Sequence, residues 1–80
     1  MISQIRFDRL GLNTKKNSVI VLSNDMYELV RVIENEVEKE GINPALLDFR
    51  WNPQGDGKHY LVRHGINSIV GAFTITNVSG

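Results

Sequence analysis

The sequence has no cysteine among its 80 residues. This absence excludes disulfide bonds, thiolate nucleophiles and cysteine metal ligands. Small secreted domains usually depend on disulfide bonds, so we expect a cytoplasmic protein. Residues 1–12 include three charged side chains and no long apolar core, which indicates no secretory signal. No apolar run approaches the ~18 residues that cross a bilayer, and we expect no membrane association.

A strong net charge is also missing, because nine basic residues balance nine acidic ones. The balance argues against a strongly basic nucleic-acid binder and against an acidic mimic of nucleic acid. The charges are nevertheless segregated along the chain. Residues 1–24 are mainly basic, residues 25–40 are mainly acidic, and no charged side chain follows His64.

The length allows one domain, residues 1–80, with one hydrophobic core. The apolar fraction of 41% and the charged fraction of 22% are typical of a globular domain. A chain this short hides only about 60–65% of the surface that its unfolded form exposes. We therefore expect marginal stability, which self-association would raise.

Residues 25–41 carry the clearest helical pattern. Asp25 can cap the first turn, and Glu28 three residues later completes a capping box. Gly41 is expected to end the helix, since glycine tolerates the left-handed conformation that follows a helix. The apolar residues recur with helical spacing and predict one buried stripe made of Met26, Leu29, Val30, Ile33 and Val37.

Five segments have the alternation or the β-branched composition of strands: residues 2–12, 18–22, 48–52, 58–64 and 69–78. Asn43-Pro44-Ala45 can open a single helical turn, and residues 53–57 form a turn. Short connections favour antiparallel pairing. We therefore predict an α+β fold: an antiparallel sheet of about five strands in the order strand, strand, helix, strand, strand, strand. One amphipathic helix would pack on one face and leave part of the other uncovered.

No motif indicates catalysis or a metal. Gly55-Asp56-Gly57-Lys58 resembles a phosphate-binding loop, but Asn52 and His59 stand where that motif needs glycine and a hydroxyl residue, and a strand follows instead of a helix. His59 and His64 are five residues apart on one strand, so they point to opposite faces. We expect no enzyme, no metal site and no cofactor. A histidine enzyme whose site is completed across a dimer interface remains a third hypothesis.

The hairpin of residues 48–64 interleaves basic and aromatic side chains. Such a surface can hold phosphates and stack bases. The candidate ligand-binding residues are Arg50, Trp51, Lys58, His59, Tyr60 and Arg63. The alternative is that Trp51 and Tyr60 belong to the core, as strand aromatics commonly do, and that Arg50 pairs with Asp48 or with glutamates of the helix.

The register of this hairpin decides which side chains share a face. We favour the register in which Phe49 and Trp51 face the core with Tyr60 and Val62. The outer face would then show Asp48, Arg50, Asn52, His59 and Arg63, with Leu61 as the one misplaced apolar residue. A slip by one residue would bury His59 and Arg63 and is expected to cost more.

The charge-free segment after His64 has two interpretations. Residues 69–75 form either a central strand or an edge that a partner covers. The second interpretation makes Phe73 and Ile75 interface candidates. The acidic helix surface adds three further candidates, Glu28, Glu34 and Glu38, which would steer toward a basic partner. The charge-free segment and the uncovered second face of the sheet together predict a homo-oligomer, most simply a symmetric dimer.

The sequence thus favours a small non-catalytic binding module. Our first hypothesis is a regulatory or inhibitory protein-interaction protein that acts as a homo-oligomer. A viral accessory protein is compatible with this role, although no residue points to one. The alternative hypothesis is that the hairpin 48–64 binds a nucleotide, another small phosphorylated ligand or single-stranded nucleic acid. Protein partner and ligand are not identified by any motif.

Overall fold

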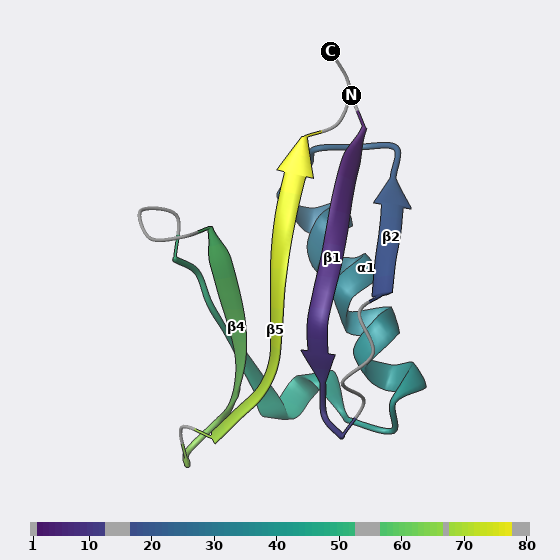
Figure 1. Cartoon of the computed structure of the whole chain (residues 1–80). Helices are drawn as coiled ribbons and strands as arrows, with labels where there is room; N and C mark the ends of the chain where they lie inside the picture. The colour runs from purple at the N-terminus through teal and green to yellow at the C-terminus, as the bar shows by residue number, and fades with distance from the viewer. Residues whose placement is uncertain (1, 13–16, 53–56, 67, 78–80) are drawn as a thin grey trace.

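The computed structural model describes residues 2–12, 17–52, 57–66 and 68–77 (Figure 1). The described residues form one sheet, one long helix and one short 3-10 helix, which confirms the predicted α+β class and the order of its elements. The elements are β1 (Ser3–Leu10), β2 (Asn17–Val21), α1 (Met26–Lys39), the short 3-10 helix η1 (Pro44–Leu46), β3 (Leu47–Arg50), β4 (Lys58–Arg63) and β5 (Ser68–Asn77). The predicted turn at 53–57 lies outside the described residues except for Gly57.

The sheet has the order β2-β1-β5-β4-β3, and all neighbouring strands are antiparallel. The last strand of the sequence therefore lies in the centre, between β1 and β4 (Figure 1). Phe73 has no exposed surface, and Ile75 is half-buried against the core. The interface interpretation of Phe73 and Ile75 is therefore wrong, because both edges of β5 are paired within the chain.

The helix α1 packs on one face of the sheet, behind β1 and β2 in Figure 1. The Asp25 carboxylate caps it by accepting a hydrogen bond from the Tyr27 amide at 3.0 Å. The Asp25 amide donates to the Ser23 hydroxyl at 3.0 Å, so Ser23 takes the place predicted for Glu28 in the capping box. Gly41 follows the helix with a φ of 79°, as expected for a left-handed end.

The buried stripe of α1 consists of Leu29, Ile33 and Val37. Val30 is half-buried, whereas Met26 is 48% exposed. The prediction for Met26 is wrong because this residue opens the helix at the margin of the core. The stripe faces the sheet and joins a single core cluster of Ile5, Phe7, Leu10, Val21, Leu29, Ile33, Val37, Leu61 and Phe73.

A bulge in β1 shapes the surface described below. Phe7 pairs with Phe73 and Arg9 pairs with Ala72, so Asp8 is the extra residue between them. A bulge inserts one residue and shifts the alternation of side chains after it. Asp8 and Arg9 consequently turn to the same side, and Leu10 returns to the core.

The register of β3 and β4 differs from the favoured prediction. Phe49 pairs with Leu61 and Arg50 pairs with Tyr60. Paired residues share a face, so Leu61 joins Phe49 in the core and Tyr60 lies with Arg50 on the opposite face. The prediction is wrong because both faces accommodate apolar side chains here: Leu61 is 0% exposed in the core, and Val62 is 2% exposed on the other face.

Candidate functional site

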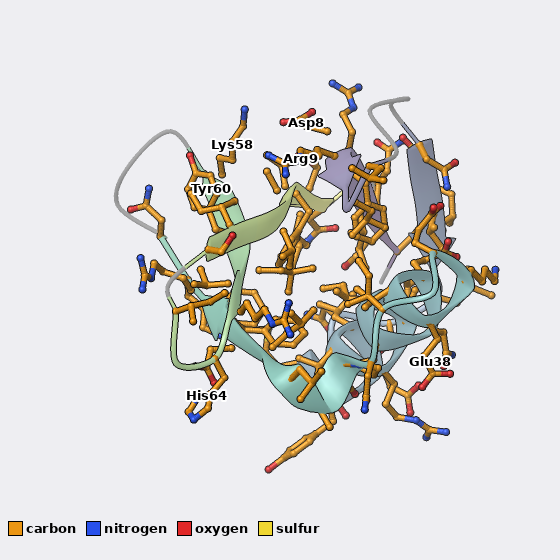
Figure 2. The ribbon with its side chains drawn as sticks, turned by 90° about the horizontal axis from the view of Figure 1, so that it is seen from below. Asp8, Arg9, Glu38, Lys58, Tyr60 and His64 are labelled. Atoms are coloured by element: carbon orange, nitrogen blue, oxygen red, sulfur yellow. The ribbon has the colours of Figure 1, made fainter. Side chains whose placement is uncertain are left out.

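The two faces of the sheet differ in what covers them. One face carries the core and α1. We call the opposite face, which α1 does not cover, the open face. Figure 2 shows Asp8, Arg9, Lys58 and Tyr60 on this side of the ribbon, and Glu38 of α1 on the other side.

Two rows of paired residues cross the open face. In the first row Arg9 pairs with Ala72, Ala72 with Tyr60, and Tyr60 with Arg50. In the second row Arg6 pairs with Thr74, and Thr74 with Lys58. We call these the arginine–tyrosine row and the arginine–lysine row. They bring together cations from β1, β3 and β4 that are far apart in the sequence.

The small residues of β5 form the floor between the cations. Ala72 and Thr74 separate Arg9 and Arg6 from the side chains of β4. The arginines of both rows are exposed, whereas Tyr60 and Lys58 are half-buried. The two rows therefore present exposed guanidinium groups and a half-buried tyrosine ring on either side of the small side chains of β5.

An ion pair spans this floor. Lys58 Nζ lies 2.9 Å from Asp8 Oδ2, although β1 and β4 are separated by β5. Alternation after the core residue Phe7 places Asp8 on the open face, and the β1 bulge adds Arg9 to the same face. Among the described residues, the open face then carries the four cations of the two rows, together with the carboxylates of Asp8 and Asp48.

Tyr60 and Arg50 lie directly opposite each other on neighbouring strands. Such pairs have Cβ atoms about 4.5–5.5 Å apart. Tyr60 follows Lys58 by two residues on the same strand, so both side chains point to the open face. An aromatic ring is thus flanked by a guanidinium and by an ammonium group, which is the combination that base stacking and phosphate binding require.

The structure divides the predicted hairpin residues between two faces. Arg50, Lys58 and Tyr60 are on the open face, whereas Trp51 and His59 lie on the core side. Trp51 stacks on Phe49 with ring centroids 5.4 Å apart, and His59 contacts Trp51 at 5.1 Å and Phe73 at 5.5 Å. Trp51, which is 38% exposed, and the half-buried His59 pack against the edge of the core and do not join the cations.

His59 has a structural hydrogen bond. Its Nδ1 accepts from the Asn52 amide at 2.9 Å. A ring nitrogen that accepts cannot carry a proton, so the bound tautomer has its proton on Nε2. His59 thereby holds the chain that follows β3 against the start of β4, and this role explains its position on the core side.

Arg63 is separated from the other candidates. It lies at the far end of β4, where it pairs with Leu47 of β3 and Ser68 of β5. The pairing with Leu47 places it on the same side of the sheet as the core. Arg63 is exposed and belongs to neither row.

His64 and Asp48 form an exposed pair at that same end. His64 Nδ1 lies 2.9 Å from Asp48 Oδ2, and the His64 amide donates to the Leu46 carbonyl at 2.8 Å. The hydrogen bond to Asp48, followed by the charge of Asp48, raises the pKa of His64 above its ordinary value of 6.5. Both contacts tie the start of β3 to the end of β4.

Arg6 and Arg9 are the site residues that the sequence reasoning missed. The basic character of residues 1–24 is a signal for them, and the alternation around Ile5 and Phe7 places Arg6 outward. Their neighbours on the open face follow from the pairing of β1 with β5, which joins segments about 65 residues apart. Local patterns contain no information on that pairing.

The acidic side of the molecule is the solvent-facing surface of α1. Glu28 and Glu38 are exposed, and Glu34 is half-exposed. Lys39 Nζ pairs with Glu36 at 3.2 Å in the same helix. The molecule therefore has a cationic sheet face and an acidic helix face on opposite sides.

Within the described part of the chain, no group of three or more His, Asp or Glu residues is placed to hold a metal ion, and no pocket is found. None of the helices described is both long and apolar enough to cross a bilayer. Comparisons with protein families, with curated proteins and with solved structures find no match.

Proposed function

We propose that the open face binds single-stranded nucleic acid. The observation that carries this proposal is the arginine–tyrosine row, in which Tyr60 lies between Arg50 and, beyond Ala72, Arg9. The arginine–lysine row runs beside it. The proposal develops the sequence hypothesis of a nucleic-acid-binding hairpin and moves the site from the hairpin to the sheet face.

The chemistry of the two rows matches the two parts of a nucleotide. A guanidinium group donates two parallel hydrogen bonds to a phosphate. A base stacked on an aromatic side chain contributes about 1–3 kcal/mol to binding. Ala72 beside Tyr60 leaves space above the floor for a base, and the Thr74 hydroxyl can exchange a hydrogen bond with a base edge.

The extent of the cations favours a strand over a mononucleotide. Neighbouring strands of a sheet lie about 4.8 Å apart. Arg9 and Arg50 are on β1 and β3, which are three strand spacings apart in the sheet order, or about 14 Å. One phosphate cannot contact both guanidinium groups. Successive phosphates of one chain can contact Arg9, Arg50 and Arg6 together.

The charge separation supports the same site. A net charge of zero gives little long-range attraction to a polyanion. The acidic surface of α1 repels phosphate, so binding is directed to the open face. A cytoplasmic location, as predicted from the sequence, would give such a protein access to RNA.

A salt titration tests the proposal. We would measure the fluorescence anisotropy of labelled oligopyrimidines of about 12 nucleotides, as DNA and as RNA, since sites of this kind cover about 4–16 nucleotides. Each phosphate contact lowers the logarithm of the affinity by about 0.7 per tenfold increase in salt. Three contacts predict a slope near −2. Absence of binding at low salt, or binding that salt leaves unchanged, would contradict the proposal.

A second candidate is the regulatory or inhibitory protein-interaction role. The exposed glutamates of α1 favour it, since an acidic helix face can steer a basic partner into contact. Its test is charge reversal of Glu28 and Glu38 to lysine, with the partner identified by crosslinking in cells. Loss of the crosslinked species supports this role, and an unchanged set of species argues against it.

A further inference from the structure

The two edges of the sheet are protected to different degrees. β2 and β3 are the edge strands. Proteins commonly protect edges with charged side chains, proline, bulges or very short strands. β3 has only four residues, and two of them, Asp48 and Arg50, are charged and exposed. This edge has the usual protection.

β2, with five residues, has no charged side chain, no proline and no bulge. Its register against β1 runs without a shift from Ser3↔Val21 to Phe7↔Asn17. Ile20 is 56% exposed and Leu22, the next residue but one, is 81% exposed. The outer edge of β2 is thus a regular, uncharged strand edge with exposed apolar side chains.

We propose that two copies of this chain associate through β2, edge to edge and antiparallel, around a two-fold axis. The inference goes beyond the proposed nucleic-acid binding and does not depend on it. A second copy supplies the same uncharged strand. When the two β2 strands pair in antiparallel orientation, no charged side chain of one strand faces a like charge on the other. Ile20 of each copy would lie at the junction, where its exposed surface becomes covered.

The β1 arginines next to β2 are far apart across this junction. Arg6 on β1 is paired with Ser18 of β2, so the Arg6 side chains of two copies are separated by three strand spacings, about 14 Å. The Debye length is about 8–10 Å at moderate salt. Repulsion between the two arginines is therefore largely screened.

The dimer would join two five-stranded sheets into one continuous sheet. Both open faces would then form adjoining parts of one surface. An edge contact of five residues is smaller than a standard interface of about 1,600 Å². We therefore expect a weak dimer, with dissociation in the micromolar range or above, and dimerisation that depends on protein concentration.

Sedimentation equilibrium over a wide range of concentration tests this inference without nucleic acid. The wild-type protein should change from monomer to dimer as its concentration rises. Ile20→Lys should remain monomeric, because two lysines would meet at the junction. The matched control is Thr76→Lys, which adds the same charge to an exposed residue on the open face of the central strand β5. It should dimerise like the wild type.

A second variant keeps the test decisive if Ile20→Lys does not fold. Leu22→Lys changes a more exposed residue beyond the end of β2, and amide dispersion in an NMR spectrum reports whether each variant is folded. Slower amide exchange in β2 at high protein concentration would support the pairing directly. A wild type that stays monomeric at the highest concentration would overturn the inference, as would folded variants at Ile20 and Leu22 that still dimerise.

Discussion

Asp8 and Lys58 form an ion pair of 2.9 Å across the central strand of the sheet. The two residues are 50 positions apart in the sequence, and each is only partly exposed. The pair lies over the floor of the proposed binding surface. A phosphate that approaches Lys58 must compete with the Asp8 carboxylate, so the pair is expected to limit affinity.

Replacing Asp8 with asparagine should strengthen the binding of single strands. The change removes a negative charge from the open face and with it the carboxylate that competes with a phosphate for Lys58. A partly exposed ion pair contributes at most about 1 kcal/mol, so we expect an affinity up to about five times higher. Anisotropy titrations measure the affinity, and thermal unfolding should show a stability loss of no more than about 1 kcal/mol. A folded variant that binds more weakly would contradict the assignment.

Gly71→Ala should destabilise the fold. A Cβ atom at this buried position of β5 would lie 3.1 Å from Leu10 Cδ2, 3.1 Å from Leu61 Cδ1 and 3.2 Å from the Arg9 carbonyl oxygen. Overpacking of this kind costs about 1–3 kcal/mol, which urea denaturation can measure. Ser68→Ala, an exposed change in the same strand, should stay within about 0.5 kcal/mol of the wild type. Equal stability of the two variants would show that the core around Gly71, between Leu10 and Leu61, has room for an additional methyl group.

The His64–Asp48 pair should make stability depend on pH. The pKa of folded His64 is raised above 6.5, so the folded state binds the proton more tightly than the unfolded state. The contribution of the pair is fully present below pH 6.5 and is lost as pH rises through the higher pKa of folded His64. An NMR titration of His64 checks the pKa, which should return toward 6.5 in Asp48→Asn. A His64 pKa that is equal in both proteins would exclude the interaction in solution.

His59→Ala should weaken folding while leaving the binding surface in place. The change removes the acceptor of the Asn52 amide and the ring contacts with Trp51 and Phe73. Loss of a partly buried hydrogen bond costs about 1–3 kcal/mol, and Trp51 fluorescence can follow unfolding. Affinity per folded molecule should not change. A stable variant that no longer binds would place His59 in the site.

The helix and the strands were predictable because their signals are local. Asp25, Gly41 and the spacing of Leu29, Ile33 and Val37 define α1 without reference to the rest of the chain. The partner of each strand is not a local property. β5 lies in the centre of the sheet because it pairs with β1 as well as with β4. No pattern within residues 68–77 distinguishes a central strand from an edge strand.

The register of the hairpin shows a second limit. Tyr60, Leu61 and Val62 are three consecutive apolar or aromatic residues, so alternation alone does not decide which of them faces the core. The bulges in β1 and β5 shift the alternation again. Half of the predicted binding residues therefore lie on the open face, and Arg6 and Arg9 join them only through the fold.

The comparison of two arginines in one hairpin tests the central claim most directly. Arg50 and Arg63 are both exposed, and both are ligand-binding candidates in the sequence analysis. Only Arg50 lies in the arginine–tyrosine row. We would measure oligonucleotide affinity for Arg50→Ala and Arg63→Ala as a function of salt, after confirming that both variants are folded. We predict that Arg50→Ala binds about tenfold more weakly and that its salt slope is shallower by about 0.7, the value of one phosphate contact, whereas Arg63→Ala binds like the wild type. Equal losses in the two variants, or a loss in Arg63→Ala alone, would contradict binding on the open face.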